Sequence, residues 1–381
     1  MKRRLVVITE LIAPYRIPVF NALVQRPDVD SHVIFLSRTD SSMRDWRIYE
    51  EEIRFSYEVL PCWRKRLVKY NVLLNRGLVS ALQLASPDTI VCGGYNYLSS
   101  WQALRWAKRN RIPFVLWSES TSSDHRYRRT LVELLKRKFL ENCDGFVVPG
   151  KSARQYLEQL EVPPAKIFTA PNAVDIALFA AAQSRAQPPL AHLRSQLALP
   201  DKYFLFVGRL VRAKGVLDLL EAYALLAPEL RERFSVVFAG NGPMRSELEA
   251  RAREIYPGTV QFAGFVHQEE LPIYYSLAEC FVFPTHTDPW GLVVNEAMAS
   301  GLPVICTRVA GCAADLVRDN GRLISVGNLC ELASAMEEIV CDPDLRGRMA
   351  SESRELIREF SPENCAAGLA QASFALVAHV R

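Results

Sequence analysis

Two acids lie eight positions apart in the stretch from Pro284 to Val304, PTHTDPWGLVVNEAMASGLPV. Asp288 and Glu296 are separated by a Pro-Trp-Gly turn, and the apolar residues 292–299 predict a buried helix that ends at a Ser-Gly pair. Backbone amides at a helix start can hold an anion, and carboxylates accept hydrogen bonds from hydroxyl groups. The stretch suits a ligand with phosphates and hydroxyls, although the helix dipole favours acids at such a place even without a ligand.

A second candidate site lies in the motif GRLVRAKG, which starts at Gly208 directly after the apolar run YFLFV. Gly208 allows a close backbone approach, and Arg209 and Lys214 follow the predicted strand at its carboxyl end. Two cations placed there suit a diphosphate, because each charge-assisted hydrogen bond contributes about 1.5–3 kcal/mol. The motif Gly240-Asn-Gly242-Pro ends the next predicted strand, where a glycine-rich turn would let a base or ribose approach. For the motif GRLVRAKG, the competing interpretation is a basic loop at the surface.

Three further features carry weaker signals. His286 lies two residues before Asp288 and could touch a ligand or have no function. Glu119, in the sequence LWSES, follows the fourth predicted strand of the first half and would face a cleft. A basic segment interleaved with leucines could bind an anionic membrane surface or pack its apolar side inward; its cations are Arg126, Arg128, Arg129, Lys136, Arg137 and Lys138.

Short apolar runs that alternate with amphipathic helices must position these residues. In the first half such runs occur at 5–9, 31–37, 88–94, 112–118 and 145–150, and in the second half at 203–210, 234–243, 260–265, 280–285, 303–307 and 322–327. This alternation is typical of doubly wound parallel sheets. We expect two Rossmann-like domains facing a cleft: residues 1–178, a linker at 179–200, residues 201–361, and a helix at 362–381 that crosses back to the first domain.

Composition narrows the function classes further. With 381 residues, 49% of them hydrophobic and 23% charged, the chain resembles a globular protein with two domains. Residues 1–190 hold 28 Lys and Arg against 18 Asp and Glu, whereas residues 191–381 hold 18 against 24. The basic half predicts an anionic partner. No nucleic-acid module is visible, so nucleic acid is not expected.

Neither the cysteines nor the acids predict a cofactor or a metal. The nine cysteines form no CxxC or metal-ligand spacing, which favours buried thiols in a cytoplasmic protein. The pairs Asp28/Asp30 and Asp342/Asp344 match Asp-x-Asp, but both are expected to be solvated turns. We therefore expect a cytoplasmic enzyme without metal, with peripheral contact at the inner face of the membrane as a second expectation.

The sequence resembles the retaining glycosyltransferases of family 4, which have the GT-B fold. The matching text is VGRLVRAKG, AGNGP, VQFAGFV, DPWGLVVNEAMASGLPVI and PNAVD. The family's two-acid motif is Glu, seven residues, Glu, and here Asp288 stands at its first position. In the first domain, Ala13-Pro14-Tyr15-Arg16 replaces a Gly-Gly loop, and Ser118-Glu119-Ser120 replaces a histidine. These departures indicate a variant acceptor half.

The resemblance implies roles for individual residues. Arg209 and Lys214 would neutralise a donor diphosphate, Glu296 would bind ribose hydroxyls, and Asp288 would contact the sugar. Amides around four residues would meet the phosphates and sugar: Trp290, Gly291, Leu292 and Val293. Glu119 is the remaining catalytic candidate, alongside Arg209, Lys214 and Asp288.

The implied activity is metal-independent, retaining transfer of a hexosyl-type sugar from a UDP- or GDP-sugar to an acceptor hydroxyl. The acceptor would be a glycan, a lipid-linked glycan or a small molecule, in cell-envelope polysaccharide or other glycoconjugate synthesis. Two alternatives stay open: another GT-B chemistry, namely a nucleotide-sugar epimerase or glycoside phosphorylase, and a catalytically silent nucleotide-sugar-binding partner.

Overall fold

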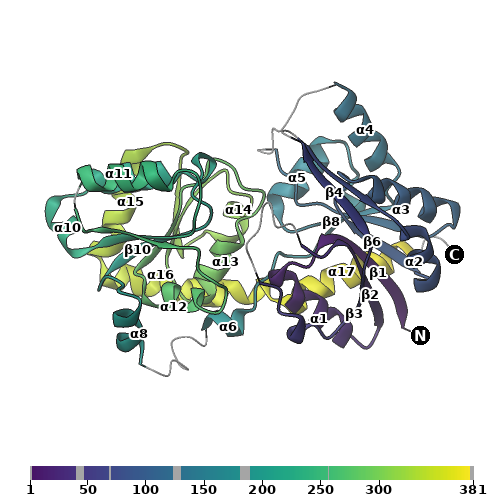
Figure 1. Cartoon of the computed structure of the whole chain (residues 1–381), viewed down its shortest axis with the longest axis horizontal. Coiled ribbons are helices and arrows are strands. Elements are labelled where there is room, and N and C mark those ends of the chain that lie inside the picture. Colours follow the sequence, from purple (N-terminus) through teal and green to yellow (C-terminus); the bar gives the residue numbers. More distant parts are fainter. Residues whose placement is uncertain are drawn as a thin grey trace. The chain divides into compact units, whose positions relative to one another are not determined.

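Two parallel β-sheets organise the chain in the computed structural model, which describes residues 2–39, 47–67, 70–122, 130–180, 189–255 and 257–377. Each sheet belongs to its own compact unit (Figure 1). The first unit comprises Met1–Ala173 and Ser361–Arg381, and the second comprises Val174–Phe360. Both are Rossmann-like α/β units.

The sheet of the first unit has the order β3-β2-β1-β6-β7-β8-β9, and every neighbouring pair in it is parallel. The strands β2 and β3 lie on one side of β1, whereas β6 and the strands after it lie on the other side. In such sheets, the carboxyl ends at this switch point are where ligands bind. The strands are β1 (Arg3–Leu11), β2 (Val29–Ser37), β3 (Ser56–Val59), β6 (Thr89–Gly93), β7 (Phe114–Trp117), β8 (Gly145–Val148) and β9 (Ile167–Thr169).

Helices cover both faces of this sheet because successive strand residues point to opposite sides. Val6 and Ile8 pack against the helices α2, α3, α4 and α5, whereas Leu5 and Val7 pack against α1 and α17. The helices are α1 (Ile17–Gln25), α2 (Leu78–Ala85), α3 (Leu98–Arg109), α4 (Thr130–Glu141), α5 (Lys151–Gln159) and α17 (Pro362–Val377). An antiparallel hairpin joins β4 (Cys62–Leu67) to β5 (Tyr70–Asn75).

The terminal helix α17 lies close against the first sheet. A Cβ added at Gly368 would come within 2.2 Å of the Thr169 carbonyl oxygen, so only glycine permits this approach. Leu369, Ala370 and Ala372 of α17 are fully buried in the same core as α1. The last residues of the chain therefore complete the first unit.

The sheet of the second unit has the order β12-β11-β10-β13-β14-β15 and is also parallel. Its strands are β10 (Tyr203–Val207), β11 (Ser235–Ala239), β12 (Val260–Gly264), β13 (Cys280–Phe283), β14 (Val304–Thr307) and β15 (Gly321–Ile324). Phe204 and Phe206 pack on one face, and Tyr203 and Leu205 pack on the other. The central strands are buried on both faces, which explains their continuous apolar sequences.

Ten helices of the second unit surround this sheet in the described part of the chain. They are α6 (Ile176–Ala180), α8 (Leu190–Gln196), α9 (Val216–Ala224), α10 (Pro228–Arg233), α11 (Arg245–Ile255), α12 (Leu271–Leu277), α13 (Leu292–Ala299), α14 (Ala313–Leu316), α15 (Leu329–Cys341) and α16 (Pro343–Leu356). The one that bears on the site is α13, which follows β13 and is buried along Val294, Asn295 and Ala297–Ala299.

Each strand expected from the sequence is present within a few residues, and both sheets are parallel as predicted. β3, β9 and the β4–β5 hairpin were not predicted; the sequences of β3 and β4, SYEV and CWRKRL, lack an apolar run, and β9 has only three residues. The range expected to be a linker contains α8, which lies in the second unit, and its residues 181–188 fall outside the described ones. No described helix is both long and apolar enough to cross a bilayer.

Candidate functional site

Two loops meet at the carboxyl ends of the neighbouring strands β10 and β13. The Ala213 carbonyl accepts hydrogen bonds from the His286 amide at 2.9 Å and from the Thr285 hydroxyl at 3.1 Å. A Cβ at Gly215 would lie 1.9 Å from the Pro284 carbonyl oxygen. The backbone thus fixes the loop after β10 against the loop after β13, and it brings the two motifs found in the sequence together.

An ion pair between Lys214 and Asp288 spans these loops. Their side chains are 25% and 14% exposed, so the pair is largely buried but still reaches the surface. The second carboxylate oxygen of Asp288 accepts a hydrogen bond from the Trp290 amide at 3.0 Å. Asp288 therefore holds the lysine with one oxygen and closes the turn before α13 with the other.

The same two loops carry hydrogen-bond donors that have no partner among the described residues. Arg209 is exposed, and its guanidinium forms no ion pair or hydrogen bond with any described residue. The amides of Leu292 and Val293, at the start of α13, likewise donate to no described acceptor. Gly291 precedes them with φ +99°, a conformation that favours glycine. An unpaired guanidinium and a helix N-terminus are both suited to an anion.

Glu296 lies one turn further along α13, in partly buried surroundings. The Tyr275 hydroxyl donates a hydrogen bond of 2.7 Å to its carboxylate. Burial raises the pKa of Glu296 to about 7, and the bond from Tyr275 offsets only part of that effect. Burial, and secondarily the adjacent Glu296, raises the pKa of Tyr275 well above its usual range. Glu296 is thus an acceptor held in place by a neutral phenol.

The glycines at the ends of β10 and β11 allow two loops to touch. A Cβ at Gly240 would lie 1.9 Å from the Gly208 carbonyl oxygen, and one at Gly242 would lie 2.4 Å from the Leu210 carbonyl oxygen. The Leu210 amide also donates to the Asn241 carbonyl at 2.9 Å. In the structure these glycines bring one loop against the other, and the expectation that they also admit a ligand stays a prediction.

Two predicted site residues have protein partners of their own. A ring nitrogen of His286 lies 2.6 Å from a carboxylate oxygen of Asp218 in α9. The Trp290 side chain is only 3% exposed, and its indole nitrogen donates to Asn295 at 2.9 Å. The Trp290 amide is already bonded to Asp288. Trp290 therefore shapes the turn, and the open amides begin at Leu292.

Sequence reasoning missed Tyr275, Asp218 and Asn295, the partners of Glu296, His286 and Trp290. Each lies far along the chain or inside an apolar helix, and no motif marks it. In the first unit, Glu119 follows β7 and forms an ion pair with Arg16, which follows β1. Arg16 was noted only as a departure from a family pattern.

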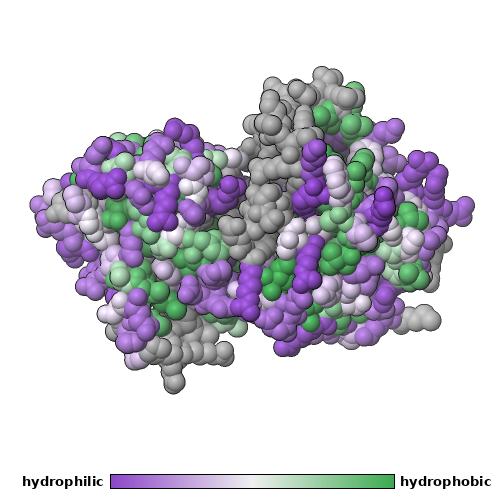
Figure 2. Space-filling view, in the orientation of Figure 1, coloured by the Kyte–Doolittle hydropathy of each residue, from purple (hydrophilic) through white to green (hydrophobic). Residues whose placement is uncertain are grey.

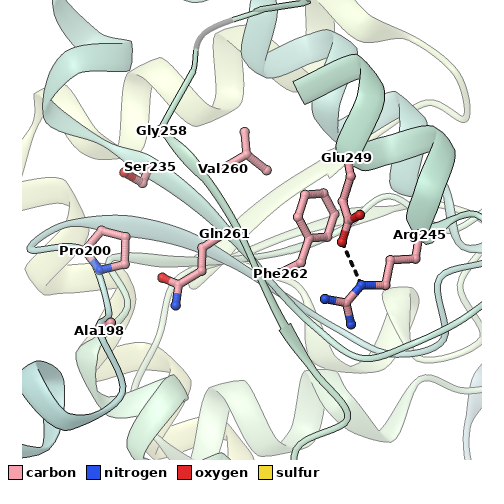
Figure 3. Close-up of a pocket in the computed structure, with 9 residues that line it drawn as sticks. All are labelled: Ala198, Pro200, Ser235, Arg245, Glu249, Gly258, Val260, Gln261 and Phe262. Atoms are coloured by element: carbon pink, nitrogen blue, oxygen red, sulfur yellow. Dashed lines mark hydrogen bonds and ion pairs between the residues drawn. The ribbon is translucent and has the colours of Figure 1, made fainter. Parts of the chain in front are cut away.

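A pocket of about 590 Å³ opens elsewhere on the second unit, beside the edge strand β12 (Figure 3). Gln261 points toward Pro200 on one side, and Arg245 forms an ion pair of 2.8 Å with Glu249 on the other. Its lining residues are Ala198, Pro200, Ser235, Arg245, Glu249, Gly258, Val260, Gln261 and Phe262. None of the predicted site residues lines this pocket.

The Asp-x-Asp pairs have structural partners. Asp30 forms an ion pair with Arg4, Asp28 forms one with Arg26, and the Asp342 side chain caps α16 by accepting from the Leu345 amide at 2.8 Å. In the described residues, no group of three or more His, Cys, Asp or Glu side chains is arranged to hold a metal ion.

Comparison with known proteins identifies the family. The model of glycosyl transferases group 1 matches residues 192–356, and that of glycosyltransferase family 4 matches residues 21–178. The chain belongs to the group 1 glycosyltransferases. The first match covers every candidate site residue of the second unit, and the second match covers Glu119.

This glycosyltransferase is similar to curated proteins along much of its length. It is 29% identical to the alpha-monoglucosyldiacylglycerol synthase of Streptococcus pneumoniae over 87% of this chain and 76% of that protein. It is 28% identical to the O-antigen chain mannosyltransferase B of Escherichia coli over 43% of each chain. Six further curated relatives match over 43–55% of their own length, so the chain spans about half of each of them.

The glycosyltransferase also shares its fold with solved structures. Anabaena Alr3699/HepE, in complex with UDP and glucose, superposes with a TM-score of 0.76 at 17% identity, over 98% of this chain and all of that chain. This confirms the GT-B fold predicted from the sequence.

Proposed function

We propose that this glycosyltransferase transfers a hexosyl-type sugar from a UDP- or GDP-sugar to an acceptor hydroxyl, with retention of configuration and without a metal ion. The observation that carries this proposal is the juxtaposition of Arg209, the Lys214–Asp288 pair and the open amides of α13 at the ends of β10 and β13.

The charges at this edge fit a diphosphate that is joined to a ribose. Arg209 and Lys214 would bind the two phosphates, since charged hydrogen bonds to phosphate are roughly twice as strong as neutral ones. The amides of Leu292 and Val293 add the positive end of the helix dipole. Glu296 would accept hydrogen bonds from the ribose hydroxyls, which release it from its unfavourable burial as an anion.

Catalysis would rest on stabilising the leaving diphosphate. Negative charge grows on it as the glycosidic bond breaks, and fixed cations and amides lower the energy of that state. In place of a metal ion, Arg209 and Lys214 supply the positive charge. Asp288 would hold Lys214 in position and face the sugar, and the acceptor hydroxyl would attack from the side that the diphosphate leaves.

The acceptor proposed is a glycan at a membrane, in cell-envelope or other glycoconjugate synthesis. The names of a glycolipid synthase and an O-antigen mannosyltransferase among the relatives support this class. On α4, Leu134 and Leu135 are 60% and 48% exposed beside the exposed Arg137 and Lys138. Hydrophobic side chains lie at the surface over α4 (Figure 2). We propose that this face rests on an anionic lipid surface.

Only part of the basic segment is exposed at the surface of α4. Lys136 is buried, with its ammonium bonded to the Tyr156 hydroxyl, and Phe139 and Leu140 also face inward. Arg126, Arg128 and Arg129 lie outside the described residues.

Leu134→Ser/Leu135→Ser should reduce sedimentation with vesicles of phosphatidylglycerol and phosphatidylcholine at low salt. Equal sedimentation of wild type and variant would remove the lipid contact.

A thermal-shift panel of UDP- and GDP-hexoses tests the donor assignment. One nucleotide class should raise the melting temperature, because a ligand that binds only the folded state stabilises it. Nuclear magnetic resonance of the transfer product then reports its anomeric configuration. No shift with any nucleotide sugar would contradict the proposal, and an inverted product would contradict retention.

A further inference from the structure

A polar pair lies at the carboxyl ends of two strands of the first sheet, on either side of β6. Arg16 follows β1 and Glu119 follows β7, and the two side chains form an ion pair. Both strands are hydrogen-bonded to β6, so the two segments that carry the pair flank the end of β6, beside the switch point between β1 and β6. Ligands of doubly wound sheets bind at such points.

The pair is held rigidly and still reaches the surface. The Arg16 guanidinium lies 4.0 Å from the centroid of the Trp117 ring, within range of a cation–π contact. The Arg16 side chain is 15% exposed and that of Glu119 is 35% exposed. Burial alone would lower the pKa of Arg16, but Glu119 together with Tyr15 and Cys365 outweighs burial, and the pKa is raised. Arg16 therefore remains charged, with its orientation fixed by two neighbours.

Open space remains at the end of β6, and hydrogen-bonding capacity remains at the pair. β6 ends in Gly93-Gly94, and a Cβ placed at Gly94 would have no atom within 4 Å. Apart from their mutual bond, the side chains of Arg16 and Glu119 make no hydrogen bond with other described residues. The guanidinium keeps donors, and the carboxylate keeps acceptor positions.

The charge balance indicates a neutral ligand. Arg16 is neutralised by Glu119, and at the end of β1 Arg64 is paired with Glu10 at 3.1 Å. An anionic ligand would meet a carboxylate beside each of these cations. A vicinal diol fits better, because one hydroxyl can donate to Glu119 while the other accepts from Arg16. The donor site differs, since Arg209 has no acid partner among the described residues.

We propose that Arg16 and Glu119 bind two adjacent hydroxyl groups on a neutral sugar ring of the acceptor. This inference rests on the proposed function and names the acceptor chemistry that the first unit recognises. The ring would lie against the Gly93-Gly94 end of β6. Arg16 donates to one hydroxyl oxygen and Glu119 accepts from the other hydroxyl.

The test is saturation-transfer nuclear magnetic resonance on the full chain in the presence of UDP. The probes are methyl α-D-glucopyranoside, methyl α-D-mannopyranoside, myo-inositol and, as an anionic competitor, glucose 6-phosphate. Glu119→Gln keeps the shape and the bond to Arg16 but removes the charge, so binding of a neutral probe should weaken about tenfold. Asp144→Asn is the matched control, since Asp144 is also 35% exposed and paired, with Lys108, but at the opposite end of the sheet.

Each outcome either supports or refutes the proposed diol site. Binding of a neutral probe that Glu119→Gln weakens and Asp144→Asn leaves unchanged supports the site. The inference is wrong if no neutral probe binds the wild type, if Glu119→Gln binds as well as the wild type, or if glucose 6-phosphate binds more tightly than the neutral probes. Calorimetry with UDP separates the two proposals: UDP should bind Glu119→Gln normally, whereas failure of UDP to bind the wild type would refute the proposed donor site instead.

Discussion

Replacing Glu296 by Gln should stabilise the ligand-free protein at pH 8 and weaken its binding of nucleotide. The carboxyl group is partly buried, and its pKa is raised from 4.5 to about 7. At pH 8 the folded protein must keep this group charged in unfavourable surroundings. Glutamine has the same shape and can still accept the bond from Tyr275, but it carries no charge.

The sign and size of the effect follow from proton linkage. A carboxyl with a raised folded-state pKa binds its proton more tightly in the folded than in the unfolded chain, so stability is lost as pH rises from about 4.5 to 7. The full shift corresponds to at most about 3 kcal/mol, and partial solvent exposure reduces this toward about 1 kcal/mol. The melting temperature should therefore rise at pH 8 by roughly 2–4 °C for each kcal/mol recovered.

The assay compares melting temperatures of wild type and Glu296→Gln at pH 5 and pH 8. The gain should be large at pH 8 and small at pH 5, where the wild-type carboxyl is protonated. Glu338→Gln is the control: its bond with Arg322 lowers the pKa of Glu338, so this variant should not gain stability at pH 8. UDP should bind Glu296→Gln about tenfold more weakly, because a charged acceptor for the ribose is lost. An equal change in stability at both pH values would refute the reasoning.

Two further variants test the turn before α13. Gly291→Ala should destabilise the second unit by about 2–4 kcal/mol in urea titrations, because at φ +99° the added Cβ would lie 2.7 Å from the Phe283 ring. Gly327→Ala is the control: Gly327 has φ +70° and open space around it, so this variant should lose only about 1 kcal/mol. Equal losses of stability in the two variants would contradict the clash. Asp288→Asn frees Lys214 while keeping an oxygen for the Trp290 amide, so calorimetry should show tighter UDP binding, by up to about tenfold, together with slower sugar transfer. Weaker UDP binding would show that Asp288 does not compete for the lysine.

The sequence predicted the framework well because long apolar strands carry a strong local signal. The central strands β10, β11, β13 and β14 are buried, and the sequence predicted the candidate site residues at the carboxyl ends of β10, β11 and β13. The loops with Lys214 and Asp288 were expected at one edge, and they are paired there. β3 and β4 were missed because their charged residues hide the alternation of a strand.

Partners distant in the chain could not be predicted. Tyr275 lies in an apolar helix, and nothing near it indicates that its hydroxyl binds Glu296. Similarly, the bond of Asp288 to both Lys214 and the Trp290 amide depends on two loops meeting in space. The motif identified the acid, and only the structure showed that both of its oxygens are engaged.

The central claim is that the second unit binds a nucleoside diphosphate at the ends of β10 and β13. Calorimetric titration of UDP and GDP into wild type, Lys214→Ala and Lys202→Ala tests it most directly, because Lys202 is a cation at the opposite end of β10. The account predicts that one nucleotide binds the wild type, that Lys214→Ala weakens it about 10- to 100-fold, and that Lys202→Ala leaves it unchanged. Equal affinity for wild type and Lys214→Ala, or no binding of either nucleotide, would contradict the account.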